Sequence, residues 1–418
     1  MRLMTSVVWL AVFGAVIGLT ACSDDGGGVD AGPDGSTDTD GGSDGGSETT
    51  CPIHVVGEGG SDVASGSTWA EGLATVERGL DLAEPLGCDV WVKAGTYLPT
   101  EDSGGSTTPV VPRTVTFRLR AGVALYGGFA GDETVLEERD IVENETILSG
   151  DLGIVDDNLD NSYSVVTGVD GATIDGFTVT DGYAGATGMG QTNGGGMYNY
   201  GSSPTVTNCT FSGNSADDAG GGMYNVNTSL PTVTNCTFSD NSAEWDGGGM
   251  ANSGSSPTVT NCTFSGNSAG SVGGGMNNFS SSPTVTNCTF SGNSADDYGG
   301  GMYNDGTWAQ TVPFLSYPAV ANCILWGGVI INESGSNAAV TFSDIQGGYE
   351  GTGNIDEDPM FVSTTDLHLQ STSPCIDTGS NEAVPDDVTT DLDGNPRIVD
   401  GNDDSTATVD MGAYEYQP

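Results

Sequence analysis

Residues 194–214 read GGGMYNYGSSPTVTNCTFSGN, and closely similar stretches follow one another until Asn304. The methionine of each Gly-Gly-Gly-Met segment falls in steps of 26 or 27 residues, at Met197, Met223, Met250, Met276 and Met302. A fixed period of this length is typical of solenoids, in which each repeat buries its apolar face only against its neighbours. The sequence therefore predicts a stack of similar coils between residues 192 and 304.

The apolar positions within one repeat indicate short strands joined by corners. Cys209 and Phe211 are two residues apart, as on one face of a strand, whereas Val206 and Cys209 are three residues apart. Because a step of three would reverse the face of a continuous strand, we place a corner at Asn208, a residue type that enters the left-handed region at low cost. Thr, Val and Phe favour strands, and no helical spacing of apolar residues is present.

Asparagine recurs at two further positions of the repeat, and we interpret the three Asn positions as separating three short strands per coil. Such a coil has a roughly triangular section, which predicts an all-β chain folded as a parallel β-helix. Stacking turns each repeated position into a column with a rise of about 4.8 Å per coil. The two further columns are Asn199, Asn225, Asn252, Asn278 and Asn304, and Asn214, Asn241, Asn267 and Asn293.

The columns divide into inward and outward positions. We expect Met, Val and Phe to fill the interior, while Thr263 points outward by alternation and contributes little to stability. The Asn columns can pass amide hydrogen bonds from coil to coil. A cysteine column also points inward, and we interpret it as buried free thiols that fill volume, not as metal ligands or disulfides. Its members are Cys209, Cys236, Cys262, Cys288 and Cys323.

The repeat resembles that of two groups of bacterial proteins. The Gly-Gly-x-Met and Phe-x-x-Asn pairs, such as Phe211 with Asn214, are similar to the repeats of chlamydial polymorphic outer-membrane proteins. More broadly, the repeats resemble bacterial right-handed parallel β-helix surface proteins. The resemblance implies a right-handed β-helix that occupies residues 51–345, with regular repeats over 192–304.

The net charge restricts the partners of this chain. The 418 residues include 57 Asp and Glu but only 8 Lys and Arg, which gives a formal charge of −49. Nucleic acid is excluded as a partner, because phosphate binding requires cationic side chains, and direct adsorption to anionic headgroups is disfavoured for the same reason. A strongly acidic chain of this kind is typical of a well-solvated exported protein.

The N-terminus predicts export and lipid attachment. Residues 1–21 combine Arg2 with an apolar run and end in Leu-Thr-Ala before Cys22, which resembles the signal peptide and lipobox of bacterial lipoproteins. The resemblance implies that Cys22 becomes the lipidated N-terminus and that the membrane is a partner through this anchor, at the outer membrane or cell surface. Residues 22–50 are rich in Gly, Asp, Ser and Thr, and they predict a disordered tether.

A short helix should cap the open end of the β-helix. Thr68-x-x-Glu71 is a capping box, and Leu73, Val76, Leu80 and Ala83 share one helical face. Capping elements of this kind cover the exposed end of a solenoid.

Cys51 and Cys88 precede two short strand-like segments at almost the same offset. Parallel pairing of these segments would bring the two thiols together, so we predict a disulfide between them in the exported chain. His54 and His368 lie in no nucleophile motif, and we interpret both as strand residues.

Residues 346–418 carry a second resemblance. Asp366-Leu-His-Leu, Ser373-Pro-Cys-Ile-Asp, Asp391-Leu-Asp-Gly-Asn-Pro-Arg and Asp410-Met-Gly-Ala-Tyr-Glu occur in the order that marks the choice-of-anchor Q domain of bacterial β-helix proteins. No activity is defined by that motif. A calcium ion is conceivable as a cofactor here, although an acidic surface loop is the simpler interpretation. The oxygen ligands would be Asp391, Asp393, Asp400, Asn402 and Asp404.

Acidic residues recur before the glycine-rich strand, at Asp217-Asp218, at Glu244 with Asp246, and at Asp296-Asp297. Paired carboxylates about 5 to 9.5 Å apart can hydrolyse glycosidic bonds. However, the third repeat carries Ala269-Gly-Ser-Val272 there, and no His or aromatic platform accompanies the acidic residues consistently, which favours solvated loops. We therefore assign no catalytic residue.

The sequence thus predicts a surface-anchored protein for adhesion or display that binds a polysaccharide or cell-surface ligand without catalysis. A polysaccharide-degrading enzyme, either a glycoside hydrolase or a lyase, is the first alternative. A structural surface stalk is the second alternative.

Overall fold

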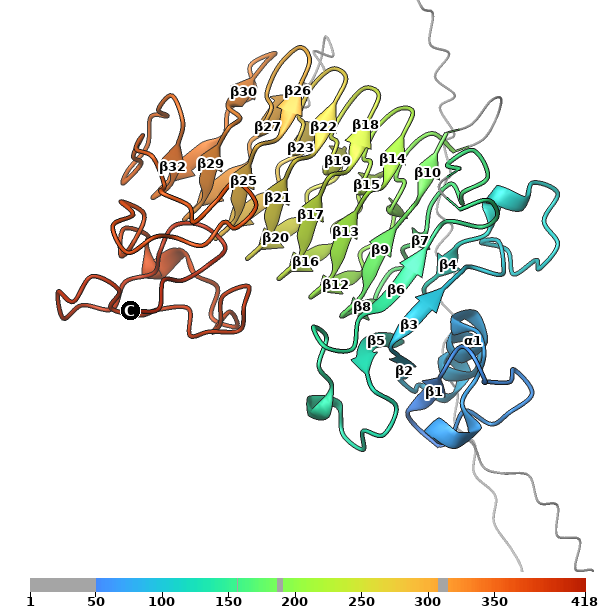
Figure 1. The fold of residues 1–418 in the computed structure, drawn as a ribbon. Helices are drawn as coiled ribbons and strands as arrows, with labels where there is room; N and C mark the ends of the chain where they lie inside the picture. Colours follow the sequence, from blue (N-terminus) through green and yellow to red (C-terminus); the bar gives the residue numbers. More distant parts are fainter. Residues whose placement is uncertain (1–49, 156, 186–190, 307–314) are drawn as a thin grey trace, which may run out of the picture. The chain divides into compact units, whose positions relative to one another are not determined.

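The computed structural model describes residues 50–155, 157–185, 191–306 and 315–418. In these residues the named strands pair only in parallel and form four sheets, in which successive coils lie side by side (Figure 1). We name three of the sheets after the side chain that the regular repeats turn inward, and the fourth after its length. The Val sheet contains β1 (Ile53–Val55), β2 (Val90–Lys93), β5 (Ala124–Phe129), β8 (Thr173–Asp175), β12 (Thr205–Thr207), β16 (Thr232–Thr234), β20 (Thr258–Thr260), β24 (Thr284–Thr286), β28 (Ala319–Ala321) and β31 (Ala339–Thr341).

The other three sheets follow the same order along the chain. The Phe sheet contains β3 (Gly95–Tyr97), β6 (Thr146–Ser149), β9 (Thr178–Thr180), β13 (Thr210–Ser212), β17 (Thr237–Ser239), β21 (Thr263–Ser265), β25 (Thr289–Ser291), β29 (Ile324–Trp326) and β32 (Asp344–Ile345). The Met sheet contains β4 (Phe117–Arg118), β7 (Val166–Thr167), β11 (Met197–Tyr200), β15 (Met223–Val226), β19 (Met250–Ser253), β23 (Met276–Phe279), β27 (Met302–Asp305) and β30 (Ile330–Asn332). The short sheet contains β10 (Tyr183–Ala184), β14 (Ser215–Ala216), β18 (Ser242–Ala243), β22 (Ser268–Ala269) and β26 (Ser294–Ala295).

The predicted interior columns are confirmed. Met197 pairs with Met223, Val206 with Val233 and Phe211 with Phe238, and the same register continues through the later repeats. Every Met, Val and Phe of these columns is at most 1% exposed. The four Phe rings stack with centroids 4.5–4.9 Å apart and planes within 6° of parallel. The core is therefore a set of continuous apolar columns, in which each coil supplies one layer.

Each regular coil has four strands, so the prediction of three was wrong. The additional strand is the two-residue β14, which pairs with β18 of the next coil and precedes the Gly-Gly-Gly segment. Sequence patterning overlooked it because a strand of two residues shows no alternation.

The asparagine columns also differ from the prediction. Asn208 is at a corner with φ of 51°, as expected, but Asn199 lies inside β11 and its side chain is fully buried. The corner after β11 is made instead by Gly201, whose φ is 58°. Asn199 donates an amide hydrogen bond to Asn225 at 2.8 Å, and the bonds continue along the column. This column is an interior polar ladder whose amides satisfy one another.

The Gly-Gly-Gly segment is required by the close approach of the coils. Gly220 has a φ of 71°, which is the left-handed region that a glycine enters without strain. At Gly221 a Cβ atom would lie 2.3 Å from the carbonyl oxygen of Ser242 in the next coil. Any side chain at Gly221 would therefore push neighbouring coils apart.

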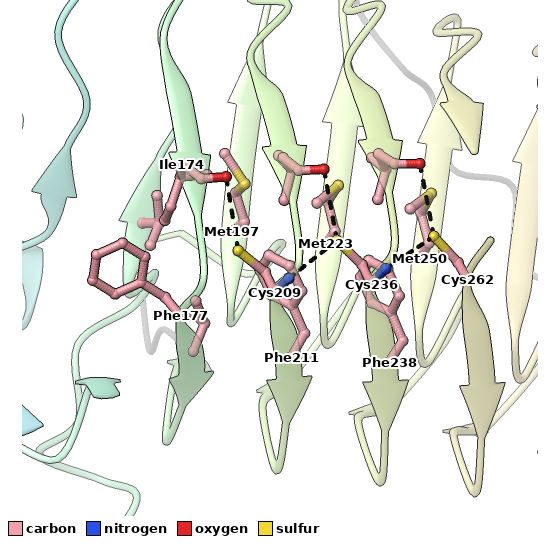
Figure 2. Packing of buried hydrophobic residues seen from close by; sticks show 14 of the residues in the cluster. Ile174, Phe177, Met197, Cys209, Phe211, Met223, Cys236, Phe238, Met250 and Cys262 are labelled. Atoms are coloured by element: carbon pink, nitrogen blue, oxygen red, sulfur yellow. Dashed lines mark hydrogen bonds between the residues drawn. The ribbon is translucent and has the colours of Figure 1, made fainter. Parts of the chain in front are cut away.

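The cysteine column consists of free, buried thiols, as predicted, but the thiols also form hydrogen bonds. The backbone amide of Cys209 donates to Sγ of Cys236 at 3.4 Å, and Sγ of Cys209 donates to the carbonyl of Ile174 at 3.8 Å (Figure 2). At the end of the column, the hydroxyl of Ser343 accepts from the amide of Cys323. From Cys209 to Ser343 the position holds a small hydrogen-bonding group, whereas the buried ring of Phe177 fills the equivalent position of the preceding coil.

The N-terminal end is covered by α1 (Val76–Leu86), whose Val76, Leu80 and Ala83 belong to the main core. The helix begins later than predicted, because Thr75 is its N-cap. Thr68 instead caps the short 3₁₀ helix η1 (Trp69–Glu71). The other 3₁₀ helices of the described residues are η2 (Pro112–Thr114), η3 (Leu136–Glu138) and η4 (Asn381–Ala383).

The N-terminal strands pair in the manner that the disulfide prediction requires. Strands β1 and β2 are parallel with Ile53 opposite Val90, and the preceding Cys51 and Cys88 are bonded, with Cα atoms 5.2 Å apart. The bond ties the first strand to the second within the capped end.

Residues 346–418 pack against the outside of the Val and Phe sheets and form no named strand. Asn261 Nδ2 donates to the carbonyl of Thr390 at 2.7 Å, and the amide of Ala413 donates to Oγ1 of Thr289 at 3.0 Å. Thr263 points outward, as predicted, but it is only 2% exposed. The signal peptide, Cys22 and residues 22–49 of the tether lie outside the described residues. In the described residues, no helix has the length and apolarity needed to cross a membrane.

Candidate functional site

The repeats differ from one another on the outer face of the Met sheet and in the turns that precede it. Because Met197 and Asn199 of β11 point inward, the alternate residues Tyr198 and Tyr200 point outward. In the Val sheet the corresponding outer positions of the four regular repeats are all Thr. In the Met sheet they vary from coil to coil. The outer residues of successive coils are Tyr198 and Tyr200, Tyr224 and Val226, Ala251 and Ser253, Asn277 and Phe279, and Tyr303 and Asp305.

Aromatic side chains gather on this face. The rings of Tyr198 and Tyr224 stack with centroids 5.9 Å apart and planes 20° apart, and Tyr200 stacks against Tyr198 at 6.5 Å. Tyr200 is 63% exposed. As the sequence indicates, these aromatic residues do not recur in every coil, since the equivalents of Tyr224 in the next two coils are Ala251 and Asn277. Tyr198 and Tyr224 occupy the same position of successive repeats, and the pairing of β11 with β15 places their rings together.

The acidic residues lie in the turns that connect the short sheet to the Met sheet. Asp218 follows β14 and Asp246 follows β18, and the amide of Asp246 donates to the carbonyl of Asp218 at 3.1 Å. Ala219, Asp246 and Val272 form parallel bridges from coil to coil. The two carboxylates therefore belong to neighbouring coils that are about 4.8 Å apart.

Burial raises the pKa of Asp246 to about 6, and the negative charge of Asp218 adds to the effect. Desolvation and a like charge both disfavour ionisation of a carboxyl group. Near neutral pH, Asp246 thus keeps a protonated fraction that an exposed Asp would lack. A carboxylic acid beside a second carboxylate is the arrangement that acid–base chemistry on glycosidic bonds requires.

Asp218 and Asp246 line a groove of about 240 Å³ on the Met sheet, together with Tyr224. This groove combines aromatic surface, acidic groups and amide groups in one depression. Its lining is completed by Asn193, Ala219, Ala251, Asn252, Ser253, Asn277 and Phe279.

The other acidic candidates do not join the groove. Asp217 accepts a hydrogen bond from the hydroxyl of Tyr183 at 2.8 Å, and Glu244 is exposed. Asp297 accepts from Ser271 at 3.3 Å, and Asp296 beside it is exposed. The neutral turn of the third repeat separates this last pair from Asp246, as the sequence indicates.

The calcium candidates are engaged in loop structure. Asp391 is 1% exposed, and its two carboxylate oxygens accept from the amides of Asp393, Asn395 and Glu415. Asp400 and Asn402 accept from the amide of Asp404. In the part of the chain that the structure describes, no three His, Cys, Asp or Glu side chains converge as metal ligands.

The two histidines differ in environment. His54 lies in β1, where its Nδ1 is 2.9 Å from the carbonyl of Gly66, and burial lowers its pKa. His368 lies outside the strands, contrary to prediction, with Asp366 2.5 Å from Nδ1 and Asp393 2.6 Å from Nε2. Burial opposes protonation of His368, but the two carboxylates outweigh it and raise its pKa. Asp393 is thus a partner of His368.

The parallel stacking of coils defines a parallel β-helix. Residues 141–345, slightly less than half of the chain, match the family model described as the right handed beta helix region. No curated protein matches the sequence.

Solved structures align with most of this chain. Pectate lyase Pel9A aligns over 88% of this chain and 98% of its own, with 14% identity and a TM-score of 0.47. Pectin methylesterase from carrot aligns over 74% and 87%, with 12% identity and a TM-score of 0.40. Pectin methylesterase from Aspergillus niger aligns over 74% and 88%, with 15% identity and a TM-score of 0.36. With TM-scores below 0.5, these similarities carry no argument about the fold or the activity of this chain.

Proposed function

We propose that this β-helix binds a polysaccharide chain in the groove beside Asp218 and Asp246, along the aromatic face of the Met sheet. The observation that carries the proposal is that Tyr224 lines the groove with the two carboxylates and begins an aromatic row, because it stacks with Tyr198, which stacks with Tyr200. Tyrosine rings offer flat apolar surface to the C–H faces of sugar rings, while carboxylates accept hydrogen bonds from hydroxyl groups.

The charge of the chain selects the class of polysaccharide. A formal charge of −49 and six acidic side chains in the turns beside the groove repel polyanions, including polyuronates. Uncharged glycans, and glycans that carry free amino groups, are not repelled. We therefore expect neutral or amine-bearing polysaccharides as ligands.

Display at a cell surface is the setting that the sequence supports. The lipobox-like segment before Cys22 and the resemblance of residues 346–418 to the choice-of-anchor Q domain support an exported, lipid-anchored protein. In this setting the β-helix would hold the groove away from the membrane and adhere to glycans. Many weak contacts along successive coils add through multivalency, so modest affinity per sugar suffices.

Binding is tested with the purified protein on insoluble neutral and amine-bearing glycans, such as cellulose and chitosan, with polygalacturonate as the acidic comparison. We expect retention on a neutral or amine-bearing glycan, and at least about tenfold weaker binding after Tyr198→Ala combined with Tyr224→Ala. Thr232→Ala on the Val sheet is the matched control and should bind as the unmodified protein does. Absence of binding to every glycan would favour the structural stalk.

A second candidate function is glycoside hydrolysis, which the raised pKa of Asp246 favours. In that reaction Asp246 would protonate the leaving oxygen, and Asp218 would act as nucleophile or base. Release of reducing ends that falls as pH rises above about 6, and that is lost in both Asp246→Asn and Asp218→Asn, would establish it. Binding without release of reducing ends would leave the protein a non-catalytic binder.

A further inference from the structure

A second depression, of about 520 Å³, lies where the Phe sheet meets the C-terminal segment. None of its lining residues lines the groove of the Met sheet. One wall comes from the corner of two coils, and the opposite wall from residues 358–370. The lining residues are Ser291, Gly292, Trp326, Gly327, Asp358, Met360, Phe361, Ser363, Thr364 and Gln370.

Trp326 interrupts an otherwise regular outer column of the Phe sheet. The position that pairs with it in the preceding coil is Ser291, and all earlier coils of this column also carry Ser or Thr. A small hydroxyl residue thus suffices for the coil, and the indole is present only where the C-terminal segment forms the second wall. The earlier members are Ser149, Thr180, Ser212, Ser239 and Ser265.

The opposite wall is held in a strained conformation. Met360 has a φ of 54°, although it is not a glycine, and its amide donates to Oδ1 of Asp358 at 2.9 Å. Its carbonyl accepts from the amide of Gln370 at 3.0 Å, and Phe361 bridges Leu369 in antiparallel fashion. Backbone strain of this kind persists where surrounding contacts fix it, and it is concentrated at ligand sites. Here it places Met360 and Phe361 side by side in the lining.

Two side chains with free hydrogen-bond acceptor oxygens line the depression together with Trp326 and Phe361. Asp358 uses Oδ1 for the amide of Met360, and Gln370 uses Nε2 for the carbonyl of Phe361. Within the described residues, Oδ2 of Asp358 and Oε1 of Gln370 have no protein donor. Two free acceptors beside Trp and Phe suit a ligand with hydroxyl donors on its edge and C–H groups on its faces.

We propose that this depression, which we call the Trp326 site, binds a short neutral saccharide of about two sugar rings. Its volume lies within the range of small-ligand sites, and its mixed lining suits a sugar better than a purely apolar ligand. Trp326 and Phe361 contact the ring faces, and Asp358 and Gln370 accept from the hydroxyl groups. With the proposed groove, one protein would have two separate sites for the same class of chain.

The test uses the full protein labelled with 5-fluorotryptophan and titrated with cellobiose, maltose and N,N′-diacetylchitobiose. The chain contains six tryptophans, and the fluorine resonance that disappears in Trp326→Ser belongs to Trp326. Trp326 also packs against the apolar cluster that contains Ile324 and Leu369, so this variant should melt at a lower temperature, and it serves only to assign the resonance. We expect a saturable shift of the Trp326 resonance with at least one disaccharide.

Two comparisons complete the test. Asp358→Asn keeps an oxygen for the amide of Met360 but replaces the free acceptor by a donor, and it should weaken the Trp326 titration about tenfold. The resonance of Trp245, which precedes Asp246 in its turn, reports the groove independently. A Trp326 resonance that no disaccharide shifts, or a titration unchanged in Asp358→Asn, would overturn the Trp326 site whatever Trp245 shows. A silent Trp245 with a responding Trp326 would count against the groove alone.

Discussion

The interior asparagine ladder allows a prediction with its own internal control. Asn225 donates to Asn252 at 2.9 Å, and Asn252 donates to Asn278 at 2.8 Å, with all three side chains fully buried. Asn252→Ala would therefore leave two buried groups without partners, the amide nitrogen of Asn225 and the amide oxygen of Asn278. Each such group costs about 1–3 kcal/mol, so the free energy of unfolding should fall by about 2–6 kcal/mol, in addition to the cavity.

Asn199, at the end of the ladder, provides the control. Its Oδ1 already lacks a partner in the described part of the chain, and only its Nδ2 bonds to Asn225. Asn199→Ala removes the same atoms but leaves one orphaned group instead of two. It also removes the Asn199 Oδ1 that was already unpaired, so the number of orphaned groups does not change. The cavity contributions are similar, so Asn252→Ala should cost about 2–6 kcal/mol more than Asn199→Ala.

Equilibrium urea unfolding, followed by circular dichroism, measures this difference through the transition midpoints at a common slope. Equal losses for the two variants would show that the hydrogen bonds along the ladder do not determine the cost. A larger loss for Asn199→Ala would refute the reasoning altogether.

Three further predictions concern the core, the histidines and the anchor. Phe264→Ala removes a ring stacked on both sides and should cost about 3–5 kcal/mol in urea unfolding, whereas the exposed Thr232→Ala should stay within about 0.5 kcal/mol. In NMR titrations His368 should titrate above the free imidazole value of about 6.5 and His54 below it. Because the folded pKa of His368 is raised, the stabilisation that its protonated ring contributes is fully present below about pH 6.5 and is lost as pH rises through the folded pKa. The melting temperatures of the unmodified protein and of His368→Gln should therefore differ most at low pH. A difference that grows with pH would contradict this. Cys22→Ala should abolish lipid labelling and membrane retention, and unchanged fractionation would exclude the lipoprotein proposal.

The sequence alone determined the scaffold, because the fold depends on contacts that repeat. The column of Phe211 and its equivalents could be predicted, since parallel stacking brings each residue opposite its own copy in the next coil. The corner at Asn208 could be predicted from a step of three between apolar residues. Both inferences used only the period of the repeat and the spacing of apolar residues within it.

Only the tertiary structure decided the positions that depend on contacts outside the repeat. Thr263 points outward, as predicted, but it is buried, because the irregular segment after residue 345 packs on this part of the coils. The repeat period contains no information about where such a segment packs. The sequence predicted Asn199 at a corner, because a polar side chain inside a coil is favourable only when neighbouring side chains complete its hydrogen bonds. Only the folded stack shows that they do.

The candidate sites were hidden for a related reason. Tyr198 and Tyr224 share a position that other repeats fill with Ala251 or Asn277, and they meet with Tyr200 on one face because β11 and β15 pair in register. Asp218 and Asp246 are distant in sequence and become neighbours only through the stacking of their turns. Sequence periodicity identifies what the coils share, whereas a binding surface consists of the positions where they differ, and only the folded stack shows which of those positions are adjacent.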